Sequence, residues 1–85
     1  MKNYKNKKKI LIIGGGREQL PLIELSLKMN LDVYLTDIDS KNPGLNFIKK
    51  KNFKKISTKD FENNYKFFLN KKIDSVVSCS SETAV

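Results

Sequence analysis

Residues 9–19 read KILIIGGGREQ, and the interpretation of the chain starts from this stretch. Four uninterrupted apolar residues, 10–13, lead into three glycines, and a segment with helical apolar spacing follows. A continuous Ile/Leu run is typical of a strand that is covered on both faces, as in a parallel sheet flanked by helices. Glycines permit positive φ and close approach of a ligand, and the N–H groups at the start of the next helix attract anions. The stretch therefore predicts the strand, turn and helix start of an α/β domain that binds a nucleotide or another anion.

The composition indicates one small globular domain. The chain has 85 residues, of which 39% are hydrophobic and 31% are charged. No apolar run approaches the roughly 20 residues that span a bilayer, and the basic start is not followed by the apolar region of a signal peptide. A single cysteine, Cys79, is consistent with a reducing compartment. We therefore expect a cytoplasmic protein without a membrane partner.

The net charge of +8 raises the question of nucleic-acid binding. Of the 17 basic residues, Arg17 is the only arginine, whereas nucleic-acid readers usually rely on arginine for bidentate contacts. The lysines are scattered along the chain, which favours a solvated surface over a nucleic-acid patch. A basic interaction domain without enzymatic activity is kept as an alternative. Histidine is absent, so the commonest general base and the commonest metal ligand are both missing.

The order of predicted elements defines the fold class. After a flexible basic arm at residues 1–8, the patterns predict strands at 9–13, 31–37, 53–56 and 73–78, helices at 18–29 and 59–70, and a short helical turn within 45–50. This alternation implies a parallel sheet with right-handed crossovers and strand order 3-2-1-4. Residues 9–85 are therefore expected to form a three-layer, Rossmann-like α/β half-domain.

Apolar spacing also predicts which helix faces meet the sheet. In the first helix these residues are Leu20, Ile23, Leu27 and Leu31, with Leu22 and Leu25 beside them. In the second helix they are Phe61, Tyr65, Phe68 and Leu69, with Phe67 also in the core. Pro21 is tolerated because it falls in the first helical turn. Asn30 is expected to end the first helix in a left-handed conformation, and Thr58 to cap the second.

Three loops converge at the carboxyl edge of this sheet, where ligands bind to open α/β folds. They are residues 14–17, 37–44 and 78–82. The first resembles the dinucleotide fingerprint G-x-G-x-x-G, and Asp37 follows at the expected distance, but Gln19 stands in place of the third glycine. A small NAD(P)-binding module and a glycine turn without ligand therefore stay open. No G-x-x-x-x-G-K-[ST] loop or G-x-S-x-G elbow is present, and Cys79 lacks a histidine to activate it.

The whole pattern resembles the N-terminal, pre-ATP-grasp domain of ATP-grasp enzymes. The similar segments are ILIIGGGREQLPLI at 10–23, Asp37-x-Asp39 with Asn42-Pro43-Gly44, KKI at 54–56, and IDSVV at 73–77 leading to Ser81-Glu82. That superfamily includes the carbamoyl-phosphate synthetase large subunit, biotin carboxylase and ligases of purine synthesis. The resemblance covers about residues 8–85.

The resemblance implies the leading part of a larger ligase. In the family, two further lobes hold ATP and magnesium and activate a carboxylate as an acyl phosphate, which an amine or similar nucleophile attacks. The N-terminal domain contributes to the substrate side of the cleft, and the matching residues here are Gly14, Gly15, Gly16, Arg17, Gln19, Asp37, Asp39, Ser81 and Glu82. We therefore expect a fragment that is incomplete at its C-terminus and not catalytic alone, without a cofactor or metal of its own. Its expected partners are a small carboxylate or amine substrate and the downstream lobes.

Simpler interpretations of the same residues stay open. Arg17 suits an exposed position in the first helical turn, and Asp37 suits a strand-end acid bonded to the N–H groups of the next loop. Ser81 and Glu82 suit a plain helix cap.

Overall fold

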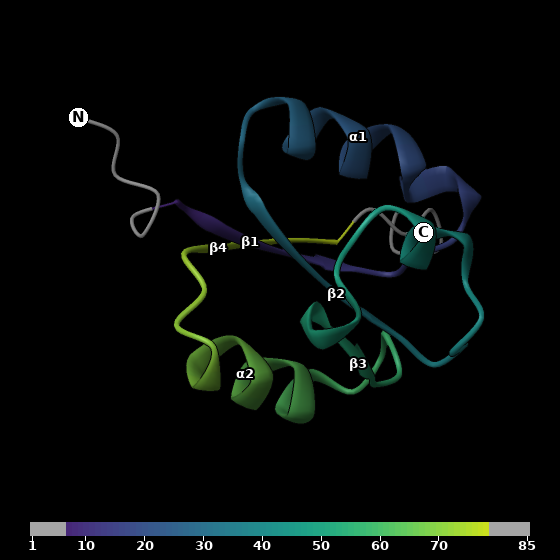
Figure 1. The fold of residues 1–85 in the computed structure, drawn as a ribbon. Helices are drawn as coiled ribbons and strands as arrows, with labels where there is room; N and C mark the ends of the chain where they lie inside the picture. The colour runs from purple at the N-terminus through teal and green to yellow at the C-terminus, as the bar shows by residue number, and fades with distance from the viewer. Residues whose placement is uncertain (1–6, 79–85) are drawn as a thin grey trace.

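The computed structural model describes residues 7–78, and within them the predicted α/β architecture is confirmed (Figure 1). Four parallel strands form one sheet in the order β3-β2-β1-β4. One helix covers each face of the sheet (Figure 1). The elements are β1 (Lys9–Ile13), α1 (Leu20–Lys28), β2 (Asp32–Asp37), β3 (Phe53–Lys55), α2 (Phe61–Asn70) and β4 (Ser75–Ser78).

The strand register brings three strand ends to one level. Ile13, the last residue of β1, pairs with Thr36 of β2 and with Ser78 of β4. Parallel strands have their carboxyl ends at the same edge of the sheet, so the loops that follow β1 and β2 start side by side. The loop after β4 also starts there, although its residues beyond Ser78 lie outside the described part of the chain.

Short 3₁₀ turns modify the predicted helices. A 3₁₀ turn at Arg17–Gln19 precedes α1, which begins later than expected, with Pro21 in its first turn as predicted. Two turns, Pro43–Asn46 and Lys50–Asn52, replace the single turn expected at 45–50. Asn30 has φ 64°, which confirms the left-handed end of the first helix. Among residues 7–78, no helix has the length and apolar character needed to cross a membrane.

On one face of the sheet, α1 packs on Ile10, Ile12, Val33 and Leu35 through the fully buried Ile23. The prediction for this helix was wrong in part, because Leu25 and Leu27 are 54% and 39% exposed. Ser26 is buried in their place and lies one helical turn beyond Ile23. Apolar spacing does not mark a serine as part of a buried helix face, which is why the prediction missed it.

On the other face, α2 packs on Leu11, Ile13, Tyr34, Ile56 and Ile73 through Phe67. The prediction for this helix was wrong in part: Phe67 is buried as expected and Phe68 packs partly against the core, but Phe61, Tyr65 and Leu69 are 81%, 62% and 54% exposed. The rotation of α2 is set instead by Asn64, which is buried.

Asn64 connects α2 to the sheet and to its own entry loop. The Thr36 hydroxyl on β2 donates to Asn64 Oδ1 at 2.6 Å. The Asn64 amide donates to the carbonyls of Ser57 and Asp60 at 3.0 and 2.9 Å. Because buried polar groups need partners, these bonds turn Asn64 toward the sheet and leave Phe61 and Tyr65 on the flank of the helix.

The cap of α2 is also different from the prediction. Asp60, not Thr58, occupies the N-cap position, and its carboxylate accepts from the backbone N–H and side-chain amide of Asn63 at 3.1 and 2.7 Å. These two hydrogen bonds, the side-chain one first, lower the pKa of Asp60 below its ordinary value. Thr58 lies near Gly14 instead.

We predict that Asn64→Ala destabilises the domain by about 1–3 kcal/mol, because it leaves buried groups without partners. Asn70→Ala is the matched control: it removes an exposed asparagine of the same helix and should change the unfolding free energy by less than about 0.5 kcal/mol. Urea unfolding followed by circular dichroism measures both variants. Equal stability of the two variants would contradict the role assigned to Asn64.

Candidate functional site

At the carboxyl edge, the loops after β1 and β2 are joined by hydrogen bonds. The Gly14 N–H donates to the Thr36 carbonyl at 2.7 Å. The Gly15 N–H donates to Oδ2 of Asp37 at 2.7 Å, and the Gly15 carbonyl accepts from the Gly44 N–H at 2.9 Å. Both polar groups of the Gly15 backbone are therefore used to connect the two loops.

Asp37 is partly buried and is held by two backbone groups. Besides Gly15, it accepts from the Asp39 N–H through Oδ1 at 2.9 Å. Asp39 is exposed and accepts from the Lys41 N–H at 2.9 Å. The simpler interpretation of Asp37 is therefore confirmed: its carboxylate accepts from an N–H group of the next loop. The glycine loop provides a second donor.

The three positions of the glycine loop differ in whether the fold requires glycine there. Gly14 has φ +103°, a conformation that other residues rarely adopt. A methyl group on Gly15 would overlap the amide oxygen of Asn42 and lie 2.9 Å from Cδ2 of Leu35. Gly16 has an ordinary φ of −72°, and a methyl group there would have its nearest neighbour at 3.7 Å. Gly14 and Gly15 are therefore required by the fold, whereas Gly16 is not.

Asn42 is the residue of this edge that the sequence did not mark as part of the site. It is 3% exposed, and its amide nitrogen donates to the Asp39 carbonyl at 2.7 Å. Its Oδ1 lies between Gly15 and Gly44 and has no conventional donor among the described residues. That position faces the Cα–H of Gly15, a weak hydrogen-bond donor. The Asn-Pro-Gly turn pattern was the only sequence signal for this packing. We name Gly15, Asp37, Asn42 and Gly44 the Gly15 junction.

Gln19 is buried against the glycine loop. Its side-chain atoms lie 3.7 Å from the positions where Gly14 and Gly16 would carry a Cβ. The third glycine of a dinucleotide fingerprint lets the helix pack closely on the strand, and here a glutamine side chain fills that position. The dinucleotide alternative is therefore weakened by geometry as well as by sequence.

The groups that face outward at this edge are few. Arg17 is exposed at the first helical turn, and the N–H groups of Gly16 and Arg17 begin that turn, where the backbone has no intrahelical acceptor. Asp37 and Asp39 add carboxylate oxygens. The edge therefore offers donors for an anion beside acceptors for an amine or hydroxyl. Ser81 and Glu82, also predicted for this site, lie outside the described residues.

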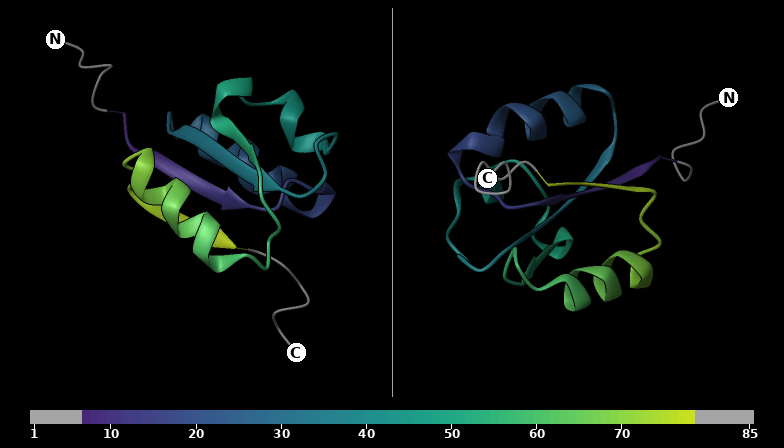
Figure 2. Two further views of the ribbon diagram at one scale, coloured as in Figure 1. Left: turned by 90° about the horizontal axis from the view of Figure 1, so that it is seen from below. Right: turned by 180° about the vertical axis from the view of Figure 1, so that it is seen from behind.

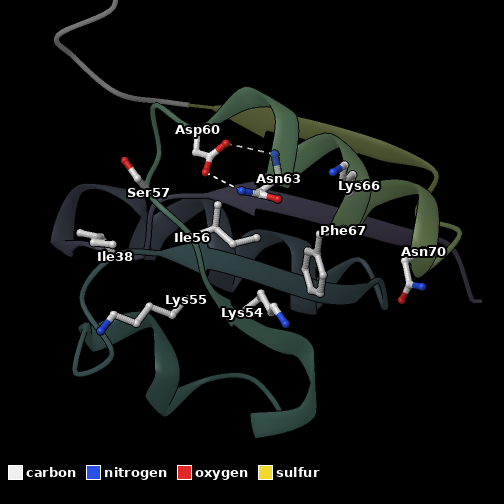
Figure 3. A pocket seen from close by; sticks show the side chains of 10 residues that line it. All are labelled: Ile38, Lys54, Lys55, Ile56, Ser57, Asp60, Asn63, Lys66, Phe67 and Asn70. Atoms are coloured by element: carbon white, nitrogen blue, oxygen red, sulfur yellow. Dashed lines mark hydrogen bonds between the residues drawn. The ribbon is translucent and has the colours of Figure 1, made fainter.

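A separate cavity of about 670 Å³ lies between α2 and β3, and none of the three glycines lines it (Figure 3). Ile56 and Phe67 line it together with Lys54, Lys55 and Lys66, and Asp60 is turned to Asn63 at its rim (Figure 3). Lysines on an edge strand discourage pairing with other chains, which accounts for those of β3. Within residues 7–78, no three His, Cys, Asp or Glu side chains converge as metal ligands would.

Comparison of the chain with protein-family models, with curated proteins and with solved structures gives no match.

We predict that Gly15→Ala destabilises the domain by about 1–3 kcal/mol, because the methyl group overlaps Asn42 and Leu35. Gly16→Ala is the matched control in the same loop and should change stability by less than about 1 kcal/mol in either direction. The unfolding free energy in urea measures both. If Gly15→Ala is as stable as Gly16→Ala, the claim that Gly15 packs closely against Asn42 and Leu35 is contradicted.

Proposed function

We propose that this chain is the substrate-side domain of an ATP-grasp ligase. One observation supports this more than any other: three of the segments that carry the resemblance are in direct contact. Gly15 of the GGGREQ segment bonds to Asp37 of the D-x-D segment and to Gly44 of the Asn-Pro-Gly segment. Residues that are 22 or more positions apart thus form one unit at the edge where α/β folds bind ligands.

The geometry favours a small substrate over a nucleotide phosphate. The N–H groups of Gly14 and Gly15 already have internal acceptors, so the glycine loop has little capacity left to hold a pyrophosphate. Arg17 and the N–H groups that begin the helical turn suit one carboxylate. Asp37 and Asp39 suit an amine or hydroxyl. We therefore assign the edge to the carboxylate or amine substrate of a cytoplasmic ligase.

ATP and magnesium take part in the proposed reaction, but in this proposal they are not bound by residues 7–78. ATP would supply the phosphoryl group that activates the substrate carboxylate, and the downstream lobes of the family supply its ligands. The role that this domain would have is to bind and orient the substrate.

Binding can be mapped by NMR on the ¹⁵N-labelled chain, titrated with acetate, glycine, L-glutamate, ATP–magnesium, NAD and NADP. We expect millimolar amino acid to shift the amide signals of Gly16, Arg17 and Asp39, and we expect no tight binding of ATP or nicotinamide cofactors. Arg17→Gln should abolish the shifts caused by acetate. Lys28→Gln removes the same charge at the far end of α1 and should preserve them.

Three results would contradict the proposal. Micromolar binding of NAD or NADP that is lost in Gly14→Ala or Asp37→Ala would establish the dinucleotide module. Steeply salt-dependent binding of DNA or RNA would favour the basic interaction domain. A stop codon directly after codon 85 in the gene, with a stable and functional monomeric product, would exclude the ligase, whereas the proposal expects a downstream glycine-rich ATP-binding lobe.

A further inference from the structure

The cavity between α2 and β3, which we name the α2–β3 cavity, is formed by consecutive elements of the chain. Its volume is about 670 Å³, and apart from Ile38 every described residue that lines it belongs to the segment 54–70. The left view of Figure 2, seen from the α2 side, shows the chain passing from β3 through residues 56–60 into α2. No residue of the Gly15 junction lines the cavity, so it is a different surface from the substrate edge.

Lysines occupy both walls of the cavity. Lys54 of β3 pairs with Thr36 of β2, and the Thr36 hydroxyl bonds to Asn64 of α2. Because paired residues of neighbouring strands point to the same face of a sheet, Lys54 lies on the α2 side. Lys66 stands on α2 itself, and in Figure 3 the lysines of β3 and Lys66 lie on opposite sides of Phe67. The two walls therefore direct positive charge at one hollow.

These positive charges are poorly compensated. Within the described part of the chain, neither Lys54 nor Lys55 has a carboxylate at salt-bridge distance. Lys66 pairs with Glu62 at 3.5 Å, but both side chains are largely exposed, and such pairs contribute little. The acid of the lining, Asp60, is turned to the backbone and side chain of Asn63. The described lining thus has three ammonium groups and one carboxylate, an excess of two positive charges.

Protection of the sheet edge accounts for the lysines of β3 but not for the wall that faces them. Asn63, Lys66 and Asn70 follow each other at helical spacing, which places them on one face of α2. Asn64 fixes the rotation of α2 through its bonds to Thr36 and the entry loop, and this rotation turns the polar face to the cavity. The α2 wall therefore adds two amides, which can donate hydrogen bonds, to its one ammonium group.

The floor of the cavity is apolar. Ile56 and Phe67 form it, and the methylene stems of the lysines extend it toward solvent. Cavities of roughly 300–1,000 Å³ hold small organic molecules, whereas a single water takes up only about 30 Å³, so an inorganic ion would leave most of this volume to solvent. The shape and the floor therefore favour a ligand with an apolar body in addition to its charge.

The excess of two positive charges favours a dianion over a single carboxylate. A phosphate monoester has a charge of about −1.5 to −2 at pH 7 and three strong acceptor oxygens, whereas a carboxylate has one charge. We propose that the α2–β3 cavity binds a small organic phosphate monoester, with the phosphate between Lys54 and Lys66 and the apolar body on Ile56 and Phe67. This site is additional to the substrate edge, and it stands whether or not the chain belongs to a ligase.

Titration of the ¹⁵N-labelled 85-residue chain with phenyl phosphate, inorganic phosphate and phenol separates the charge from the apolar body. We expect phenyl phosphate to shift the amide signals of Lys54, Lys66 and Phe67, and to bind at least about tenfold more tightly than either of the other two probes. Binding should strengthen between about pH 5 and pH 7, because the second pKa of the phosphate is about 6 and the dianion forms in this range.

Two double variants test the lysines. Lys54→Gln combined with Lys66→Gln should weaken the binding of phenyl phosphate by about tenfold or more, because both charge-assisted contacts are lost. Lys28→Gln combined with Lys49→Gln removes the same charge from exposed positions outside the cavity and should weaken it by less than about threefold. All four side chains are exposed, so we expect both variants to fold, which circular dichroism checks.

Four results would overturn the proposal. Equal affinity for phenyl phosphate and inorganic phosphate, or an equal loss in the two double variants, would show that the net charge of the chain alone attracts the anion. Shifts at Gly16 and Arg17 in place of Lys54 and Lys66 would move the phosphate to the carboxyl edge. Binding of RNA or of phosphatidic acid vesicles by a chain that does not bind phenyl phosphate would assign these lysines to a macromolecular surface.

Discussion

The Gly15 backbone is the point on which the carboxyl edge of this domain depends. Its N–H is taken by Asp37, its carbonyl by Gly44, and its Cα lies against Asn42, so no other residue type fits there. One glycine thereby connects the loop after β1 to the loop after β2. The connection also uses N–H groups that a phosphate ligand would need. The contacts that join the two loops therefore leave fewer N–H groups available to a ligand.

Buried asparagines connect the remaining segments to the sheet. Asn64 holds α2 to β2 and to its entry loop. Asn52 donates to the carboxylate of Asp32 and to the carbonyl of Val33, both at 2.9 Å, and so fixes the segment that leads into β3. Asn42 acts within the loop after β2, where its amide donates to the Asp39 carbonyl. A small domain buries limited apolar area, and hydrogen-bonded side chains give its connections a defined position that apolar contacts alone would not.

The fold was predictable from sequence because its strongest signals are local. The Ile/Leu run of β1 and the glycines after it marked the buried central strand, and the alternation of elements gave the sheet order. The buried face of α2 was not predictable in full. Asn64 is buried in preference to Phe61 and Tyr65 because it has hydrogen-bond partners on β2 and in the entry loop, and these partners are distant in the sequence. At the site, the meeting of the first two loops was predicted from topology. The direction of the Asp37 carboxylate was not, since an acid at a strand end suits a ligand and a neighbouring N–H equally well.

The central claim is that the Gly15 junction forms a single preformed unit, and native-state hydrogen exchange tests it most directly. Loops that are only loosely placed exchange their amide protons almost freely, whereas groups bonded within the core exchange only on global unfolding. We predict that the Gly15 and Gly44 amides are protected nearly as well as those of β1, and that Asp37→Ala reduces the protection of Gly15. Exchange of both amides at the rate of exposed loop residues would contradict the account.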